Sequence, residues 1–208
     1  MIRTKEDLYT YVNYDKCAYG GKPSKITDSR WSHVGWMVIH ILKDWRCNYK
    51  VFNFLFALRM HEYYANMQNK GWLEKIAWRY WRKKHDGLGV QLGFDIPINV
   101  FGPELRINHY GLVVNGNARV GAFCDIHQGV NIVNWGNDTD VPIIGDNVWI
   151  GPGAKIFGRI VIGSCCAIGA NAVVNKNFPD EGKTIAGVPA HIISDKGNPW
   201  RKKYYKFK

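Results

Sequence analysis

Residues 114–174 read VNGNARVGAFCDIHQGVNIVNWGNDTDVPIIGDNVWIGPGAKIFGRIVIGSCCAIGANAVV, and their spacing decides the fold. In steps of six, an aliphatic residue fills ten of eleven slots. A period of six matches neither the 3.6-residue period of a helix nor the two-residue period of a simple strand. The slots hold Val114, Val120, Ile126, Ile132, Asp138, Ile144, Ile150, Ile156, Ile162, Ile168 and Val174.

A six-residue repeat of this kind predicts a parallel β-helix. Each repeat forms one side of a triangular coil, and three repeats complete a turn. The aliphatic slot points inward and stacks into a ladder, with turns about 4.8 Å apart. The slot after it is often glycine, as at Gly121, Gly145 and Gly151, and glycine and asparagine suit corners where φ is often positive.

Two irregularities interrupt the repeat. Asp138, the one polar slot, lies in the stretch 134–140, which we expect to loop out of the coil and to return in phase. Upstream, the step from Ile107 to Val114 is seven residues, so this coil holds one extra residue beside His109. Function is commonly located where a regular pattern is broken.

The N-terminal part has a different pattern, with aromatic and aliphatic residues at the three- and four-residue spacing typical of helices. The chain therefore divides into a helical region at 1–92, a β-helix at 93–193 and a basic aromatic tail at 194–208, which makes it mainly β. The expected helices are Thr4–Val12, Ser32–Arg46, Val51–Met67 and Gly71–His85.

Length and charge narrow the class of protein. The chain has 208 residues, enough for a core that needs no disulfide or metal ion. Its net charge of +11 is spread as +8 over residues 1–90, −2 over 91–190 and +5 over 191–208. Glu6 and Asp7 lie where a signal peptide would have its apolar core, so no export signal is expected.

Apolar runs and cysteines predict the compartment. The runs at 34–42 and 51–58 are far shorter than a membrane-spanning helix. Five cysteines, with Cys165 and Cys166 adjacent, show no metal-binding spacing, so reduced and buried thiols are expected. These features predict a soluble, cytoplasmic protein.

The repeat and its flanks resemble the hexapeptide-repeat acyltransferases, most closely their serine acetyltransferase-like branch. The resemblance implies a left-handed β-helix, a homotrimer and acetyl-CoA bound in the groove between neighbouring coils, with no metal. It covers about residues 93–193 and is carried by Phe94-Asp95-Ile96-Pro97, Asn108-His109-Tyr110-Gly111, Ile150-Gly151-Pro152-Gly153-Ala154-Lys155-Ile156 and Ala186-Gly187-Val188-Pro189-Ala190.

His109 is the expected general base. Moving an acetyl group from a thioester to a hydroxyl requires removal of the hydroxyl proton, and imidazole has a suitable pKa for this at neutral pH. The resemblance implies that Asp95, fourteen residues earlier, orients the ring through its second nitrogen. Backbone N–H groups would stabilise the thioester oxyanion, and no acyl-enzyme is expected.

For acetyl-CoA, the resemblance points to small residues at the coil corners, where pantetheine would lie against the backbone. These cofactor-binding candidates are Gly151, Pro152, Gly169, Ala170, Ala186 and Pro189.

The acceptor is expected to be a neutral hydroxyl. Serine enzymes of this family carry an aspartate before the base and an Arg-His pair in the central loop, and here those places hold Asn108, Asp140 and Val141. Trp135 in the loop would either stack on a sugar face or pack within the loop. The sequence thus favours a sugar O-acetyltransferase acting on a surface or capsular polysaccharide precursor, with serine O-acetylation as the alternative.

The sequence also bears on functions other than acetyl transfer. A zinc hydratase of this fold needs a His-x4-His pair, but Ile132 lies five positions after His127. A non-enzymatic β-helix scaffold stays open as an alternative. The aromatic and basic tail leaves open a peripheral contact with an anionic membrane, whereas no nucleic-acid fold signature accompanies it and no nucleic-acid partner is expected.

Overall fold

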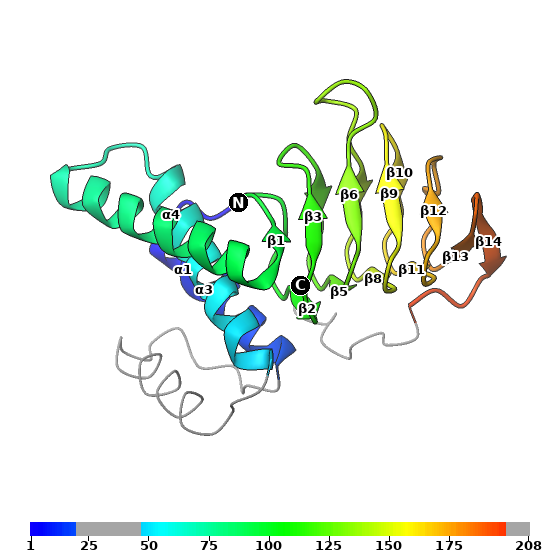
Figure 1. Cartoon of the computed structure of the whole chain (residues 1–208), viewed down its shortest axis with the longest axis horizontal. Helices are drawn as coiled ribbons and strands as arrows, with labels where there is room; N and C mark the ends of the chain where they lie inside the picture. Colours follow the sequence, from blue (N-terminus) through cyan, green and yellow to red (C-terminus); the bar gives the residue numbers. More distant parts are fainter. Residues whose placement is uncertain (20–46, 199–208) are drawn as a thin grey trace.

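The computed structural model describes residues 1–19 and 47–198, and it consists of three helices followed by a coiled stack of short strands (Figure 1). The helices are α1 (Lys5–Ala18), α3 (Cys47–Asn66) and α4 (Trp72–Leu92). The helix expected at Ser32–Arg46 lies outside the described residues, as do the last ten residues of the tail and their expected membrane contact.

Two helices run further than the sequence pattern predicts. α1 starts after a capping box, in which the Thr4 hydroxyl accepts from the Asp7 N–H, and it ends at Ala18 and not at Val12. α4 continues past His85 to Leu92 although it contains Gly89, a weak helix former that lies against the chain that follows. A Cβ at this position would come within 2.8 Å of the Phe94 carbonyl oxygen.

The strands are short and follow one another at regular intervals. In chain order they are β1 (Phe94–Asp95), β2 (Arg106–Asn108), β3 (Leu112–Val114), β4 (Arg119–Val120), β5 (Asp125–His127), β6 (Asn131–Val133), β7 (Ile143–Ile144), β8 (Trp149–Ile150), β9 (Lys155–Phe157), β10 (Val161–Ile162), β11 (Ala167–Ile168), β12 (Val173–Val174), β13 (Thr184–Gly187) and β14 (Ala190–Ser194).

These strands form three sheets, one for each side of a triangular coil. Sheet A has the order β1-β3-β6-β9-β12, sheet B the order β10-β7-β4, and sheet C the order β14-β13-β11-β8-β5-β2. All neighbours are parallel except the β13–β14 hairpin, which closes the far end of sheet C. Val114 pairs with Ile132, eighteen residues on, so three repeats complete one turn. The predicted left-handed parallel β-helix is confirmed.

The aliphatic ladder is the core of the β-helix. All ten aliphatic slots between Val114 and Val174 are buried, with Val120 the most exposed at 4%. The loop 134–140 leaves the coil between β6 and β7, and Ile144 returns in register with Val120, as expected (Figure 1). The coil tolerates this insertion because the loop adds one whole repeat and shifts no inward slot.

The glycines that follow the aliphatic slots have a different role from the expected one. Gly121, Gly145 and Gly151 are not among the residues with positive φ. The left-handed positions are held by other residues, such as Gly129 (φ 70°) and Asn171 (φ 54°). Glycine is required after the aliphatic slot because the next coil passes too close for a side chain: a Cβ on Gly145 would lie 2.7 Å from the Ser164 backbone nitrogen.

A pair of Gly→Ala variants distinguishes a glycine packed against the next coil from a glycine with open space around it. Gly145→Ala is expected to lower the free energy of unfolding by ~1–3 kcal/mol, because the added methyl overpacks two backbones. Gly87→Ala, in exposed helix α4 with no atom within 4 Å of the added Cβ, is expected to raise it by ~0.5–1 kcal/mol. Urea unfolding of both variants measures the difference, and equal effects would contradict the close-approach explanation.

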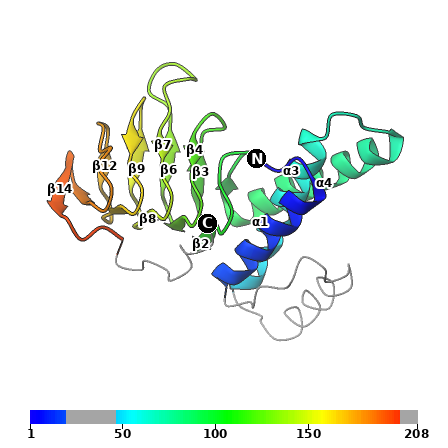
Figure 2. The ribbon, with the colours of Figure 1, turned by 180° about the vertical axis from the view of Figure 1, so that it is seen from behind.

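A buried arginine joins the helices to the first coil. Arg59 on α3 is fully buried and donates from Nε to Asp15 of α1 at 2.8 Å and from Nη1 to Glu62 at 3.0 Å. Its remaining donors reach the carbonyl oxygens of Phe101 and Gly102 at 3.0 and 2.8 Å. Figure 2, seen from behind, shows α1 against α3 beside the first coils. The helices are therefore attached to the β-helix by buried charge-assisted hydrogen bonds.

Two further expectations concern thiols and membranes. Cys124, Cys165 and Cys166 are buried and unbridged, and burial raises the pKa of the Cys124 and Cys166 thiols. A nucleophilic role for these two thiols is therefore disfavoured.

Within residues 1–19 and 47–198, no helix has both the length and the apolar character to cross a bilayer.

Candidate active site

His109 lies in the turn that carries the extra residue, between β2 and β3. Ile107 pairs with Ile126, nineteen residues on, which is one more than the ordinary turn of the coil. The turn absorbs this residue by placing His109 at φ 68°, a conformation uncommon for residues other than glycine, asparagine, aspartate and histidine. The imidazole is exposed to solvent. The irregularity predicted from spacing therefore presents the expected base at the surface.

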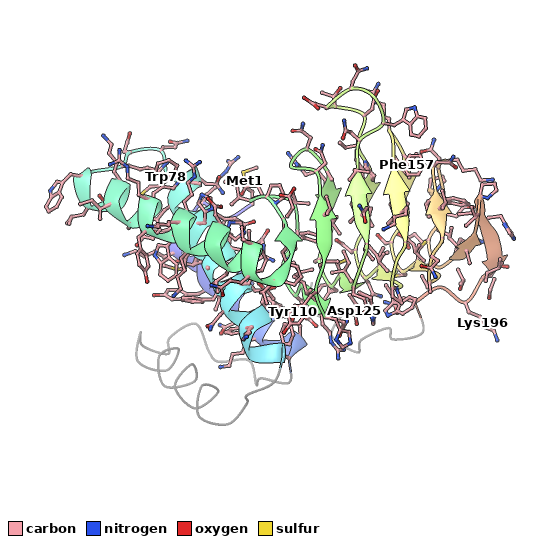
Figure 3. The ribbon with its side chains drawn as sticks, in the orientation of Figure 1. Met1, Trp78, Tyr110, Asp125, Phe157 and Lys196 are labelled. Atoms are coloured by element: carbon pink, nitrogen blue, oxygen red, sulfur yellow. The ribbon has the colours of Figure 1, made fainter. Side chains whose placement is uncertain are left out.

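A polar cluster lies beside this turn on the outer face of sheet C; we call it the Asp125 cluster, formed by Arg106, Asn108, Asp125 and His127. The Asn108 amide donates to Asp125 Oδ1 and lies 3.4 Å from His127 Nε2. Asp125 also lies 3.6 Å from Arg106 Nη1 and 3.7 Å from His127 Nε2. The Trp149 ring packs edge-on against His127, with centroids 5.1 Å apart. Figure 3 shows Asp125 near Tyr110 at one edge of the β-helix.

The protonation of His127 is set by burial. Desolvation lowers the pKa of His127 below its ordinary value, and the positive charge of Arg106 acts in the same direction. Asp125 opposes this shift but does not overcome it. His127 is therefore neutral at pH 7 and is a second imidazole able to accept a proton close to His109.

Sequence reasoning missed Asp125, Arg106 and His127 as members of the site. The signal was present: with nineteen residues in this turn, Arg106 pairs with Asp125, and Asn108 pairs with His127. Because alternate residues of a strand face outward, these four side chains share one face of sheet C. Finding them required the register, which the irregular turn at His109 hides from a step of six.

The cofactor-binding candidates lie along the same edge as His109, where sheet C turns into sheet A. The Gly111 turn is followed by turns at Gly129, Gly153 and Asn171, joined by backbone hydrogen bonds of 2.8–2.9 Å. Of the six candidates, four lie in these later turns and two lie where the closing hairpin turns: Gly151, Pro152, Gly169, Ala170, Ala186 and Pro189. The structure thus brings His109 and all six to one edge of the coil.

Packing within the coil accounts for part of this pattern. A Cβ on Gly151 would lie 2.8 Å from the Ala170 nitrogen, and one on Gly169 would lie 2.8 Å from the Ala186 Cβ. The small residues at these places are therefore required by the coil itself, whether or not a ligand lies over them. Ala170 and Pro189, which are exposed, are the candidates that this packing leaves open to a ligand.

Asp95 makes no hydrogen bond or ion pair with His109 within the described part of the chain. It lies on β1 and pairs with Val113, four residues beyond the base, and its side chain is exposed. Among residues 1–19 and 47–198, no hydrogen bond joins the Asp95 carboxylate to the His109 ring. The orienting role of Asp95 stays a prediction from the resemblance.

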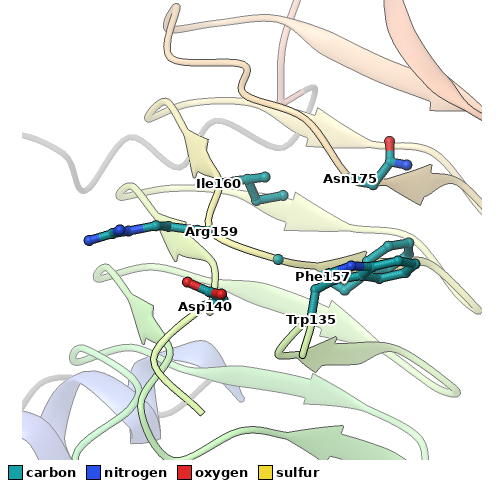
Figure 4. A pocket seen from close by; sticks show the side chains of 7 residues that line it. Trp135, Asp140, Phe157, Arg159, Ile160 and Asn175 are labelled. Carbon is teal, nitrogen blue, oxygen red and sulfur yellow. The ribbon is translucent and has the colours of Figure 1, made fainter. Parts of the chain in front are cut away.

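Trp135 lies at a different edge, where sheet A turns into sheet B. Its ring stacks on Phe157 with centroids 5.1 Å apart and planes 19° apart, and 67% of its surface is exposed. Together with Asp140, Arg159 and Asn175 these rings line an open cavity of about 340 Å³ (Figure 4). Trp135 and Asn108, the two predicted acceptor residues, therefore lie at opposite ends of the sheet A strands, and one chain does not bring them together.

Known proteins that resemble this chain agree with the repeat pattern and the parallel coil. Residues 142–176 match the family described as bacterial transferase hexapeptide (six repeats). A serine acetyltransferase of Staphylococcus xylosus is 39% identical over 99 residues, which is 46% of this chain and 45% of the relative. The chain thus spans about half the length of this curated relative.

Solved structures extend the likeness to the helices. A serine acetyltransferase of Brucella abortus strain S19, in complex with coenzyme A, aligns with a TM-score of 0.58 and 26% identity over 94% of this chain and 84% of that one. The soybean serine acetyltransferase apoenzyme aligns with a TM-score of 0.65 and 25% identity over 91% and 70%. The repeat, the parallel coil and these relatives together support a hexapeptide-repeat acyltransferase of the serine acetyltransferase-like branch.

Proposed function

We propose that this chain is an acetyl-CoA-dependent O-acetyltransferase with His109 as general base. The observation that carries the proposal is the single edge along which His109 and the six cofactor-binding candidates lie. The Brucella abortus relative, solved with coenzyme A, supports a CoA thioester as the donor. Cys124, Cys165 and Cys166 form no disulfide bond, in keeping with the reducing cytoplasm expected from the sequence.

In the proposed reaction, both substrates are bound before any bond breaks. The His109 imidazole takes the acceptor's hydroxyl proton while the oxygen attacks the thioester carbonyl carbon. The tetrahedral oxyanion collapses, the carbon–sulfur bond breaks, and the CoA thiolate leaves and takes the proton. Donors for the oxyanion would come from outside the stacked turns, since the N–H groups of Gly129 and Gly153 already donate to neighbouring coils and that of Gly111 donates to the Leu92 carbonyl oxygen at the end of α4.

We infer that serine is the acceptor. The similar proteins are named serine acetyltransferases, which favours serine over the polysaccharide precursor expected from the sequence. The absence of an aspartate at Asn108 had pointed to a neutral acceptor. The Asp125 cluster supplies that missing charge from the next coil, because Asn108 donates directly to the Asp125 carboxylate.

The charges of this cluster suit a zwitterion. An ammonium group would approach Asp125, and a carboxylate would approach Arg106, whose side chain is 43% exposed. The two side chains are 3.6 Å apart, a loose contact that a bound amino acid could replace with two shorter ones. A sugar hydroxyl needs neither charge, so the cluster favours an amino-acid acceptor.

Rates of CoA release test the acceptor. With L-serine as acceptor, the Arg106→Gln and Asp125→Asn variants are expected to raise the KM for serine by ~10-fold or more, since each removes one charge-assisted contact. The matched control Arg79→Gln changes an exposed arginine on helix α4 and is expected to leave KM unchanged. Acetylation of nucleotide-linked sugars and not of serine would favour a polysaccharide precursor as the acceptor. Failure to bind CoA in calorimetry would favour a non-enzymatic scaffold.

We also infer a homotrimer. The outer face of sheet B carries Ile143 and Val161 in register, 53% and 43% exposed, beside Arg119. Apolar side chains in register on a flat sheet face are typical of a surface covered by another subunit. A cleft between subunits would allow Trp135 of one chain to approach His109 of another. The mass in solution, measured by light scattering, tests this assembly.

A further inference from the structure

Two histidines of the helical region face each other away from the candidate active site. His61 on α3 and His85 on α4 are 8% and 6% exposed, and their Nδ1 atoms are 3.2 Å apart. The neighbouring Asp86 extends a carboxylate oxygen to 3.7 Å from His85 Nδ1. These three ligand atoms all lie within 4.8 Å of one another.

The spacing of these ligand atoms fits a single metal ion. Zinc binds imidazole nitrogen at about 2.0–2.1 Å in a tetrahedral arrangement, so two ligand atoms on one ion lie roughly 3.3 Å apart. The two Nδ1 atoms already have this separation. A set of two imidazoles and one carboxylate suits a borderline divalent transition metal, and zinc in particular.

Neighbouring groups hold the imidazole rings of His61 and His85 in a form and position suited to binding a metal ion. The His85 ring also forms a hydrogen bond with the backbone of Ile96, as metal-binding histidines do with their second nitrogen. Phe54 packs against the His85 ring, with centroids 5.0 Å apart. Burial lowers the pKa of His85 to about 4 and also lowers that of His61, so both rings are the neutral form that binds metal.

Space remains for a fourth ligand. A cavity of about 530 Å³ adjoins the three side chains and is lined on its other side by Phe94, Asp95 and Pro97. Asp86 also lies 3.7 Å from Arg82, but both side chains are more than half exposed, so the carboxylate is free to turn. A water molecule in this cavity would complete a tetrahedron.

We propose that His61, His85 and Asp86 form a binding site for one divalent transition metal ion, zinc by its donor set, which links α3 to α4 beside β1. The site is independent of acetyl transfer and goes against the sequence expectation of a metal-free protein. Without an ion, the same two rings would form a neutral imidazole–imidazole hydrogen bond. The experiment has to distinguish this hydrogen bond from a metal site.

Cobalt(II) is the probe, because its visible absorption reports both binding and ligand type. The tag-free full chain, stripped with chelator, is expected to bind one cobalt ion with a tetrahedral spectrum and to release it when zinc is added. His85→Gln and His61→Gln are expected to abolish the spectrum. Asp86→Asn, at an exposed position where folding is not at risk, is expected to weaken binding by at least the ~10-fold typical of a lost supporting contact.

Matched controls distinguish this site from other donors and from the catalytic proposal. Asp138→Asn, an exposed carboxylate of the loop 134–140, and His109→Asn are expected to bind cobalt as the wild type does. A thiolate-to-cobalt band would assign the ion to a cysteine and overturn the proposal. Unchanged binding in Asp86→Asn and His85→Gln, or no spectrum in the wild type, would leave only the imidazole hydrogen bond. Because the readout is absorption, its failure is separate from a loss of acetyl transfer.

Discussion

The His109→Asn variant is expected to lose ~10²–10⁴-fold in kcat, the range by which a positioned general base accelerates proton transfer. Asparagine is the suitable replacement because His109 has a φ of 68°, which asparagine tolerates better than alanine does. The imidazole is exposed, so the melting temperature should stay close to that of the wild type. Steady-state rates of CoA release at saturating acetyl-CoA measure the loss.

His127→Asn is the matched control for this variant. His127 is a neutral imidazole in the Asp125 cluster, close enough to influence His109 but held by Asn108 and packed by Trp149. We expect its replacement to change the KM for the acceptor more than kcat, because it supports the cluster and does not receive the proton. If His127→Asn loses kcat while His109→Asn keeps it, the base is His127 and the assignment of His109 is wrong.

Arg59→Met is expected to lower the free energy of unfolding by ~3–5 kcal/mol, the cost of leaving buried charges without their partner. The side chain is fully buried between Asp15 and Glu62, and it also donates to two carbonyl oxygens of the first coil. Methionine fills a similar volume, so the loss reflects the unpaired carboxylates and not a cavity. Chemical denaturation followed by circular dichroism measures it.

An exposed ion pair provides the comparison. Lys183 lies 2.7 Å from Asp195, and 82% of the aspartate side chain is exposed. Lys183→Met is expected to leave stability nearly unchanged, because water solvates the remaining carboxylate. If the two substitutions cost the same, the buried arginine does not hold the helices to the coil in the way described.

The architecture of the β-helix could be read from residues alone because its pattern is local and repeated. Each inward slot from Val114 to Val174 must be apolar for its coil to close, so the periodic signal accumulates with every turn. The interruption at 134–140 did not hide the pattern, since it added one whole repeat. The ends of the helices were less predictable: α4 passes His85 and includes Gly89, whose close approach to Phe94 is a contact made after the helix has ended.

In the candidate site, too, some features were predictable from the sequence and others were not. A spacing of seven in a pattern of six marked His109, and the small residues of the later turns marked one edge of the coil. The sequence by itself therefore determined the coil, the edge and the exposed imidazole, because each is a departure from, or a member of, a short repeat. Tertiary structure alone decided two other features: Asp125 meets Asn108 from the next coil beside that imidazole, and His61 meets His85 between two helices away from it. Such contacts depend on the register and the crossing of elements, and no local spacing encodes either.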